Sequence, residues 1–519
     1  MSDKKYSRKE IFQNYYEDLD YENVLEKLPD IIEEAELKAA EVLEPTIYEK
    51  REVRKVIENF IREKNRKVYG GTAINELLKK VDPNDAIYSE YVFSDIEFYS
   101  PTPIPDLVDL CNILYNKGYK YVQGKEAQHE ETYSIFVNLQ LYCDITYVPV
   151  HVYNGIKTIE IDGISYTDPH FMFIDYLRMF NDPMNAAWRW EKAFKRVYLL
   201  LKDYPLEYYD KRMQLPKTSK TIENFMSMIK EKFMMDADNQ KYCLIMGFDA
   251  YNFYIRHAAN DKNVEQLARI TQGNTNLNNL LVNVPYMELI SINYNETVIK
   301  LYNYIKSIID DKENITLEEY FPLFQFTNYS VIIKYKDEPI VKIYDANRMC
   351  IPNIKTTNGY MYVSYQYILM MMFINKFKAH LDKNKSMYFN YGIAISNLIK
   401  ARNIFLAENN LSVINKTVFS EFKISCVGST ISYMRMSLLR KLKRRNQGKK
   451  IHFAYTPEEF FKLSSDAQAK FEPSKHLFRN TSGNMIRNPK NLIFKLDEDK
   501  NIIVVNDSEN SESENESSE

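Results

Sequence analysis

The sequence is poor in glycine, proline and cysteine, and these scarcities exclude several classes of protein. Its 519 residues include only 13 glycines and 18 prolines, too few for a collagen-like or low-complexity body. The five cysteines are odd in number and scattered, and no pair has the spacing of metal ligands. We therefore expect reduced thiols and no disulfide framework in an otherwise ordinary globular chain.

Long apolar runs are missing as well. The longest one, residues 367–374, is far shorter than the roughly 20 residues that a membrane span requires. Residues 1–10 are charged and lack the apolar core of a secretory signal. These absences predict a cytosolic protein that does not associate with a membrane.

The sequence does contain a marked separation of charge. Residues 507–519 carry six acidic residues and no basic one, and residues 1–50 carry fourteen acidic and seven basic residues. Taking −6 and −7 away from the overall net charge of −3 leaves +10 for residues 51–506. A basic body with acidic ends is typical of a protein that binds a polyanion.

Hydrophobic spacing divides the chain into four regions. Residues 1–66 have apolar positions three and four apart and are expected to be helical. Residues 67–204 alternate short strands with helices, and residues 205–504 are predicted to be mostly helical up to about 320 and then rich in strands. Residues 505–519 are polar, acidic and without aromatic residues, so we expect them to be disordered.

A weak internal repeat links the second and third regions. A strand pair, a proline and a turn that runs into an apolar helix occur twice, about 195 residues apart. A hairpin followed by a helix is a common arrangement, so chance similarity is the alternative explanation.

Three acidic residues form the first candidate site. Asp95 and Glu97 lie two apart in a predicted strand over residues 91–99, so their side chains share one face. Asp144 lies in another predicted strand that a sheet could place alongside. Three neighbouring carboxylates repel one another unless cations lie between them, and a pair of Mg²⁺ ions suits such oxygen ligands. An acidic pair in a strand is more often a solvated face.

A glycine pair forms the second candidate site. Gly70 and Gly71 separate a predicted strand, residues 67–69, from a predicted helix, residues 72–81. Two glycines at this point allow the backbone to approach a phosphate and present free amides at the helix start. Thr72 adds a hydroxyl that could donate to a phosphate or cap the helix. Taken alone, a Gly-Gly step is usually just a tight turn.

The order of these features carries more information than any one of them. Strand, Gly-Gly-Thr, helix, a strand with Asp-x-Glu and a third strand with a lone Asp together resemble the DNA polymerase β superfamily of nucleotidyltransferases. More specifically, the chain resembles the giant-virus poly(A) polymerases in the segments VYGGTAINELL, SDIEFYSP, LYCDITYVP and DYLRMFNDP…WRWEKAFKR. The resemblance is specific over residues 50–200 and looser elsewhere. It departs in using Asp-x-Glu rather than the commoner Asp-x-Asp, and in a long gap between Gly71 and Asp95.

The resemblance implies a fold, an activity and roles for these residues. The fold would be α+β, with a polymerase-β-type nucleotidyltransferase domain over residues 67–204 and a second, degenerate nucleotidyltransferase-like half. The activity would be template-independent transfer of AMP from ATP to the 3′ end of single-stranded viral mRNA. The metal ligands of two Mg²⁺ (or Mn²⁺) ions would be Asp95, Glu97 and Asp144, and the ATP phosphates would lie over Gly70, Gly71 and Thr72.

The resemblance further implies a homodimer that acts in the host cytoplasm, in viral factories, with packaging in the virion as an additional location. Two alternative functions stay open. One is a uridylyl- or CCA-adding enzyme with the same acids, and the other is a non-catalytic RNA-binding subunit that retains the fold.

Basic residues complete the predicted site. A predicted helix over residues 188–200 carries Lys192 and Arg196 on one face, and both are candidates for contacts with the triphosphate, with Arg178 as a weaker third. A solvated basic face is the alternative. Residues 435–450 contain eight basic residues and no acidic one. We predict that this run contacts the RNA backbone through Arg440, Lys441, Lys443, Arg444 and Arg445, with an ordinary solvated loop as the alternative.

Overall fold

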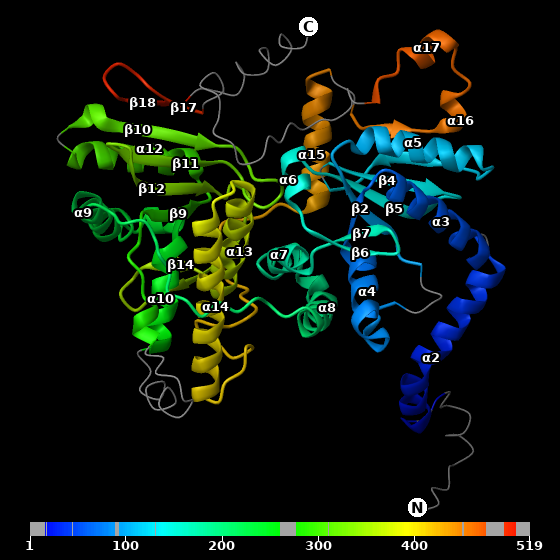
Figure 1. Cartoon of the computed structure of the whole chain (residues 1–519), viewed down its shortest axis with the longest axis horizontal. Helices are drawn as coiled ribbons and strands as arrows, with labels where there is room; N and C mark the ends of the chain where they lie inside the picture. The colour runs from blue at the N-terminus through cyan, green and yellow to red at the C-terminus, as the bar shows by residue number, and fades with distance from the viewer. Residues whose placement is uncertain are drawn as a thin grey trace, which may run out of the picture.

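Two eight-stranded mixed sheets, each flanked by helices, make up the two halves of the molecule (Figure 1). In this computed structural model the described residues are 16, 18–43, 45–88, 93–129, 131–259, 277–309, 311–448, 451–473 and 493–504. The predicted disorder of residues 505–519 concerns a segment outside these residues. The mixed sheets with flanking helices confirm the predicted α+β class.

The first sheet has the strand order β16-β3-β4-β5-β2-β1-β7-β6. Its strands are β1 (Lys67–Tyr69), β2 (Ile96–Ser100), β3 (Gln123–Glu126), β4 (Thr132–Val137), β5 (Gln140–Tyr147), β6 (Thr158–Ile161), β7 (Ile164–Thr167) and β16 (Ala454–Tyr455).

The second sheet has the order β10-β11-β12-β9-β8-β14-β13-β15. Its strands are β8 (Cys243–Met246), β9 (Met287–Ser291), β10 (Ile315–Tyr320), β11 (Ser330–Tyr335), β12 (Glu338–Asp345), β13 (Ile351–Lys355), β14 (Met361–Val363) and β15 (Cys426–Val427). A separate two-stranded sheet joins β17 (Phe494–Leu496) to β18 (Ile502–Val504).

The two large sheets are copies of one topology. Each strand from β1 to β7 occupies the same place in its sheet as the strand numbered seven higher. The directions agree too, because β2 with β5 and β9 with β12 are parallel, and β1 with β2 and β8 with β9 are antiparallel. The predicted internal repeat is therefore confirmed, and it includes seven strands rather than the hairpin alone.

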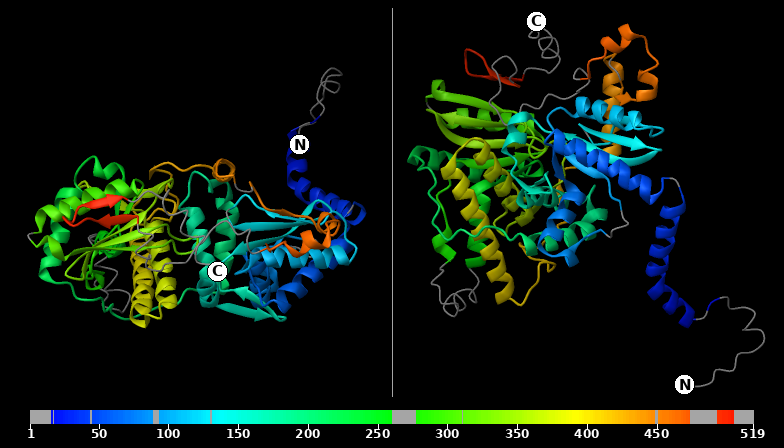
Figure 2. Two further views of the ribbon diagram at one scale, coloured as in Figure 1. Left: turned by 90° about the horizontal axis from the view of Figure 1, so that it is seen from above. Right: turned by 45° about the vertical axis from the view of Figure 1, so that its right-hand side comes forward.

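Helices pack on both sheets, and α2 (Asp18–Val42) extends away from the first half (Figure 2, right). Those of the N-terminal side are α2 (Asp18–Val42), α3 (Ile47–Glu63), α4 (Gly70–Val81), α5 (Pro103–Asn116), α6 (Val150–Gly155), α7 (Pro169–Phe180) and α8 (Trp190–Asp203). Those that follow are α9 (Lys220–Met228), α10 (Gly247–Ala259), α12 (Tyr294–Ile308), α13 (Tyr365–Leu381), α14 (Lys385–Glu408), α15 (Tyr433–Asn446), α16 (Pro457–Phe460) and α17 (Ser465–Ala469).

The predicted N-terminal helices form as α2 and α3. In α3, the buried residues Val53, Ile57, Phe60 and Ile61 recur at three- and four-residue spacing, so one face packs on the first half. Thr46 caps this helix, because its hydroxyl accepts a hydrogen bond from the Glu49 amide at 3.3 Å.

The two halves meet through helices α7 and α13, which lie between the sheets (Figure 2, left). Aromatic rings interlock there, with the ring centres of Phe173 and Phe373 5.4 Å apart and their planes nearly perpendicular. The apolar run 367–374 of α13 is fully buried in this junction. It is therefore core, which explains why so apolar a segment occurs in this chain.

Some predicted elements differ from the structure. The described residues from 205 to 320 are mostly helical, as predicted, but they also contain the strands β8, β9 and β10, because short buried apolar runs such as CLIM show no alternation that separates strand from helix. The strand predicted over residues 91–99 begins at Ile96, so Asp95 precedes it. In addition, β16 returns to the first sheet and pairs Ala454 with Lys125. The boundary between residues 204 and 205 thus stays a prediction.

The thiols also differ from expectation for one pair. Cys350 and Cys426 form a disulfide with Cα atoms 5.4 Å apart. They are 76 residues apart in sequence and meet because β13 pairs with β15, a contact that spacing along the chain does not reveal. Cys111, Cys143 and Cys243 are free and buried. Within the described ranges, no helix combines the length and the apolar character needed to cross a membrane.

Candidate active site

The glycine turn connects β1 to α4 and requires glycine. Gly70 has a φ of +72°, which side chains disfavour, and a Cβ atom there would collide with the carboxylate of Glu97. The amide of Gly71 donates a hydrogen bond to Glu97 Oε2 at 3.1 Å. The turn therefore ties the start of α4 to the acidic strand next to it.

The sheet places two of the predicted acids side by side. The parallel strands β2 and β5 pair in a register that sets Glu97 opposite Asp144, and β1 sets Tyr69 opposite Glu97. Because residues directly opposite each other in a sheet project from the same face, the two carboxylates and the glycine turn share one face. Asp95 lies two residues before Glu97, just outside β2.

Hydroxyl groups hold the acidic segments in place. The hydroxyl of Thr72 lies 3.0 Å from Ser94 Oγ and donates to the carbonyl oxygen of Asp95 at 3.0 Å. Thr72 is buried within α4, where its hydroxyl positions the acidic segment and does not cap the helix, which begins at Gly70. Its predicted contact with a phosphate stays a prediction. Ser134 donates to Asp144 Oδ1 at 2.5 Å from the neighbouring strand β4.

The carboxylates are difficult to ionise in the absence of a cation. Burial, followed by the charge of Asp95, raises the pKa of Glu97 to about 7. Burial likewise raises the pKa of Asp144 to about 6, against the opposing effect of the Ser134 hydrogen bond. Hard oxygen ligands on one face whose ionisation is resisted by burial and by one another fit divalent cations such as Mg²⁺.

The acids have not converged on a single point. In the part of the chain that the structure describes, no three His, Cys, Asp or Glu side chains lie close enough to hold a metal ion. Glu97 turns towards the amide of Gly71 and Asp144 towards the hydroxyl of Ser134. Binding of ions would require both side chains to exchange these partners.

Two predicted basic residues on α8 face the site. Arg196 donates to the hydroxyl of Tyr88 at 2.7 Å, and a Cβ atom on Gly71 would lie 3.2 Å from Arg196 Nη2. The guanidinium therefore lies beside the glycine turn. The pKa of Lys192 is lowered, mainly by the charge of Arg196, while the charges of Asp95 and Glu97 act in the opposite direction. This exposed lysine is thus close enough to both acids to interact with them.

Arg178 is engaged elsewhere. It lies in the last turn of α7, where its guanidinium bonds Asp175 Oδ1 at 2.9 Å and lies 5.9 Å from the centre of the Phe326 ring. Its predicted contact with the triphosphate would need a different side-chain position.

Sequence reasoning missed two contacts in this site. Tyr88 lies over the glycine turn, where its hydroxyl is bonded to Arg196, and Ser134 supports Asp144 from the next strand. Nothing in the sequence distinguishes Tyr88 from the other 40 of its 41 tyrosines. The alternation of strand residues could have suggested Ser134 only after the pairing of β4 with β5 was known.

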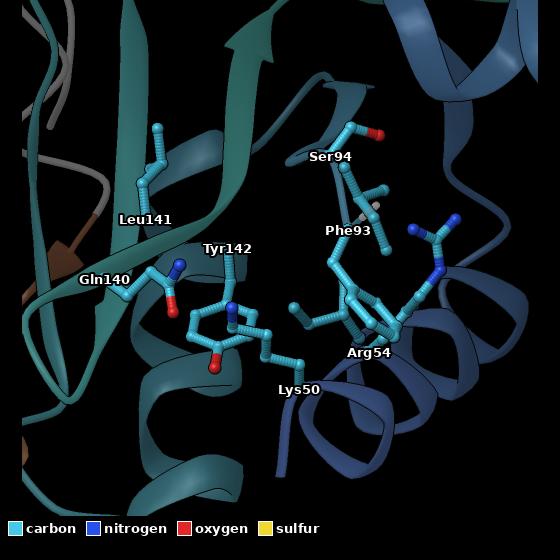
Figure 3. Close-up of a pocket in the computed structure, with 9 residues that line it drawn as sticks. Lys50, Arg54, Phe93, Ser94, Gln140, Leu141 and Tyr142 are labelled. Atoms are coloured by element: carbon cyan, nitrogen blue, oxygen red, sulfur yellow. The ribbon is translucent and has the colours of Figure 1, made fainter. Parts of the chain in front are cut away.

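A small pocket lies at the edge of the site beside Ser94 (Figure 3). Lys50 and Arg54 of α3 reach it from one side, and Tyr142 of β5 from the other. Its cavity volume of about 10 Å³ is comparable to the space for a single water molecule. It is too small for a nucleotide, so the pocket is a polar recess and not the ATP site.

The predicted RNA-binding run folds into α15 and is only partly available. Arg444 is buried, and its guanidinium forms a double hydrogen bond to the Glu126 carboxylate at 2.7 and 2.9 Å. It is therefore a structural residue, and its predicted contact with RNA is wrong. Arg440 donates to the carbonyl oxygen of Gln128 at 3.0 Å. Lys441 is half-buried, and Lys443 and Arg445 are exposed.

Comparison with known proteins gives two family matches and close relatives. Residues 55–186 match the family model "Poly(A) polymerase catalytic subunit", and residues 220–496 match "APMV, Putative poly(A) polymerase, catalytic subunit, C-terminal". A protein of Acanthamoeba polyphaga mimivirus named "Putative poly(A) polymerase catalytic subunit" is 61% identical over 512 residues, which cover 96% of this chain and 88% of that protein.

A protein of the same name from African swine fever virus (strain Badajoz 1971 Vero-adapted) is more distant, at 27% identity over 183 residues, 33% of this chain and 38% of that protein. The crystal structure of the Megavirus polyadenylate synthase superimposes with a TM-score of 0.89 and 58% identity. The match covers 98% of this chain and 99% of that one.

Proposed function

The chain belongs to the poly(A) polymerase catalytic subunit family, and on this premise we propose that it transfers AMP from ATP to the 3′ end of single-stranded RNA without a template. It is a nucleotidyltransferase by family and a poly(A) polymerase by its relatives. The observation that supports this assignment from the chain itself is the register of Glu97 opposite Asp144, next to the turn at Gly70 and with Arg196 beside it.

Two Mg²⁺ or Mn²⁺ ions are part of this proposal. Asp95, Glu97 and Asp144 would hold them, and bound ions would neutralise the triphosphate and the charge that develops during transfer. The acids lie on one face of the sheet with no basic residue between Glu97 and Asp144 in the register. Because no side chain of β2 or β5 neutralises these carboxylates, the positive charge that they require would come from cations in solution.

The side chains and backbone of the turn would position the reactants. The ATP phosphates approach the amides of Gly70 and Gly71, and Glu97 releases the amide of Gly71 as they do so. Lys192 and Arg196 bind phosphate oxygens from α8. Asp144 orients the RNA 3′-hydroxyl and accepts its proton as the 3′-oxygen attacks the α-phosphorus in line. The bond between the α-phosphorus and the oxygen that bridges to the β-phosphate breaks, and pyrophosphate leaves. Catalysis then consists mainly of positioning and of neutralising charge.

Four finer predictions accompany this function. The substrate would be viral mRNA in the host cytoplasm, with the virion as a further location, and the enzyme would act as a homodimer. Contact of α15 with RNA through Arg440, Lys441, Lys443 and Arg445 stays a prediction. Arg178 also stays a candidate for the triphosphate, although Asp175 holds it in the structure.

An extension assay tests the function. Short RNA is incubated with each radiolabelled nucleoside triphosphate in turn, with and without Mg²⁺. We expect long products with ATP and Mg²⁺ only, loss of product in Asp144→Asn, and RNA binding retained by that variant. Asp345→Asn is the control, because Asp345 lies on β12 of the other sheet and caps the Asn347 amide at 2.8 Å.

Other outcomes would identify the alternatives. Preference for UTP, or addition limited to CCA, would indicate another nucleotidyltransferase with the same acids. Absence of any product from well-folded protein that binds RNA would identify a non-catalytic subunit. Extension by Asp144→Asn at the rate of the unsubstituted enzyme would show that the metal ligands are assigned incorrectly.

A further inference from the structure

Helix α2 is an amphipathic helix that lacks an apolar partner over most of its length. It extends away from the first half, and it contacts α3, which follows it in the chain (Figure 2, right). Apolar side chains recur along it at three- and four-residue spacing, which places them in one stripe. They are nevertheless exposed: Tyr21 65%, Val24 46%, Leu25 53%, Leu28 38%, Ile31 55% and Ile32 47%.

The other faces of α2 are strongly acidic. Between Asp18 and Val42 the helix carries nine acidic residues and only two lysines. Glu22, Glu34 and Glu36 border the apolar stripe on its two sides and are exposed. A surface that would pair with α2 must therefore offer an apolar strip with basic residues along its edges.

Helix α15 offers such a surface. Between Tyr433 and Asn446 it carries six basic residues and no acidic one. Its inward face is fixed by Ser437 and by the ion pair of Arg444 with Glu126. Its outward face presents aliphatic side chains one turn apart, and they are largely exposed: Met434 63%, Leu438 57% and Leu442 51%.

Basic residues surround this outward strip. At 100° per residue, Arg435 and Lys441 lie on opposite sides of Leu438, and Arg445 lies within the strip itself. RNA phosphates would engage these charges but would leave the three aliphatic side chains in water. An acidic amphipathic helix satisfies both parts of the surface, so the observations favour a helix over RNA as the occupant of this face. The predicted RNA contacts of Lys441 and Arg445 would then be replaced by contacts with that helix.

We infer that α2 of one copy docks on the outward face of α15 of a second copy, and that the exchange is reciprocal. In one chain α15 lies at the upper centre and α2 at the lower right, well apart, so the pairing joins two copies (Figure 1). The two-fold symmetric exchange buries both apolar strips twice and places acidic edges beside basic ones. This inference rests on the homodimer of the proposed function and identifies its contact surfaces.

A charge-swap experiment on the full chain tests the pairing. One variant carries Glu22→Lys, Glu34→Lys and Glu36→Lys on α2, and the other carries Arg435→Glu, Lys441→Glu and Arg445→Glu on α15. All six side chains are exposed or half-buried, so we expect both variants to fold. Mass is measured by analytical ultracentrifugation against the 61.5 kDa of one chain.

We expect the unsubstituted chain to sediment at twice that mass and each variant alone at the mass of one chain. An equimolar mixture should return to the double mass, because both contacts in the mixed pair again join opposite charges. The control reverses three exposed lysines of the second half, Lys312→Glu, Lys355→Glu and Lys385→Glu, and should remain double.

Three results would overturn the inference: an unsubstituted chain at single mass, a variant that stays double when alone, or a mixture that stays single. Loss of RNA affinity in the α15 variant with its double mass unchanged would assign the surface to RNA and also overturn it. AMP incorporation is measured in parallel on the same samples. If the chain forms the pair of double mass but incorporates no AMP, the proposed function is refuted and the inferred pairing is not.

Discussion

The two halves of the molecule share one sheet topology, and they differ most at the point where the first half carries its acids. Gly247 follows β8 with a φ of +65°, as Gly70 follows β1 with a φ of +72°. Glu288 lies opposite Met246 in the register, as Glu97 lies opposite the residue before Gly70. A Cβ atom on either glycine would collide with the carboxylate of its neighbouring glutamate. The second half has therefore kept the turn and one acid.

The third acid is replaced by a base. Lys342 lies opposite Glu288 on the parallel strand β12, the place that Asp144 occupies in the first half. The ammonium of Lys342 lies 4.5 Å from the ring centre of Tyr344 and 5.1 Å from that of Tyr320. The hydroxyl of Tyr344 donates to Glu288 at 3.2 Å. Asp345, the last residue of this strand, lies three residues further on.

The difference shows two ways to neutralise the same buried glutamate. In the second half the cation is part of the chain, and the site is closed, with Glu288 2% and Lys342 5% exposed. Burial raises the pKa of Glu288 and lowers that of Lys342 to about 8, while each charge moderates the shift of the other. In the first half the place of the lysine belongs to an acid, and the missing positive charge must come from solution.

The largest expected difference concerns catalysis. Asp144→Asn should reduce AMP incorporation by about 10³-fold, because it removes an anionic ligand at the reacting centre. Lys342→Met, at the equivalent position, should leave the turnover number of the folded protein unchanged. Turnover is measured at saturating ATP and is expressed per folded molecule. A comparable loss in both variants would show that the second half takes part in catalysis.

The next largest effect concerns the stability of the second half. Lys342→Met should lower the free energy of unfolding by about 3 kcal/mol, because Glu288 would remain buried without a nearby positive charge. The double variant Lys342→Met with Glu288→Gln should recover most of that loss. Urea denaturation measures both values. Equal stabilities of the single and double variants would mean that the two charges do not interact.

A smaller effect concerns the dependence of stability on Mg²⁺ and on pH, which should arise from the acids of the first half only. The pKa of Glu97 is raised to about 7, so the folded protein binds more protons than the unfolded chain above pH 4.5. The stability of the metal-free protein should therefore fall as pH rises from about 4.5 to 7 and level off above that range. Mg²⁺ at about 100 times its Kd should add about 2.7 kcal/mol of stability above pH 7 and less at pH 5.

Thermal unfolding with Mg²⁺ or with a chelator measures this effect. Asp144→Asn should reduce the stabilisation by Mg²⁺, whereas Lys342→Met should retain it in full. A pH-independent response to Mg²⁺ would indicate that the ion binds away from Glu97.

The smallest effects concern the two glycine turns. Gly247→Ala should destabilise the protein by about 1–2 kcal/mol through its left-handed backbone, with a further cost from the collision with Glu288, and should leave turnover intact. Gly70→Ala should cost about as much and should also abolish turnover. Gly118→Ala is the control, because φ there is +90° but a Cβ would meet nothing within 4 Å. If all three substitutions cost the same, the collisions are unimportant.

Much of the first half could be predicted because its signals are local. The Gly-Gly step, the acids two residues apart and the alternation of β1, β2 and β5 each lie within a few residues. The contacts of Tyr88 with Arg196, and of Ser134 with Asp144, join residues from different elements, so no spacing along the chain encodes them. The repeat in the second half was predicted, but its retained turn at Gly247 and its glutamate Glu288 were not, because Glu288 has a lysine as partner and no acidic motif remains.

The sequence by itself determined the chemical groups and the period at which they recur, and hence the acids, the glycine turn and the repeat. Only the tertiary structure decided which of those groups meet water. Arg444 and Arg445 are adjacent and identical in kind, yet one is buried on Glu126 and the other is exposed. The cost of removing a charge from water depends on what surrounds it after folding, and that is a property of the packed molecule and not of residue type.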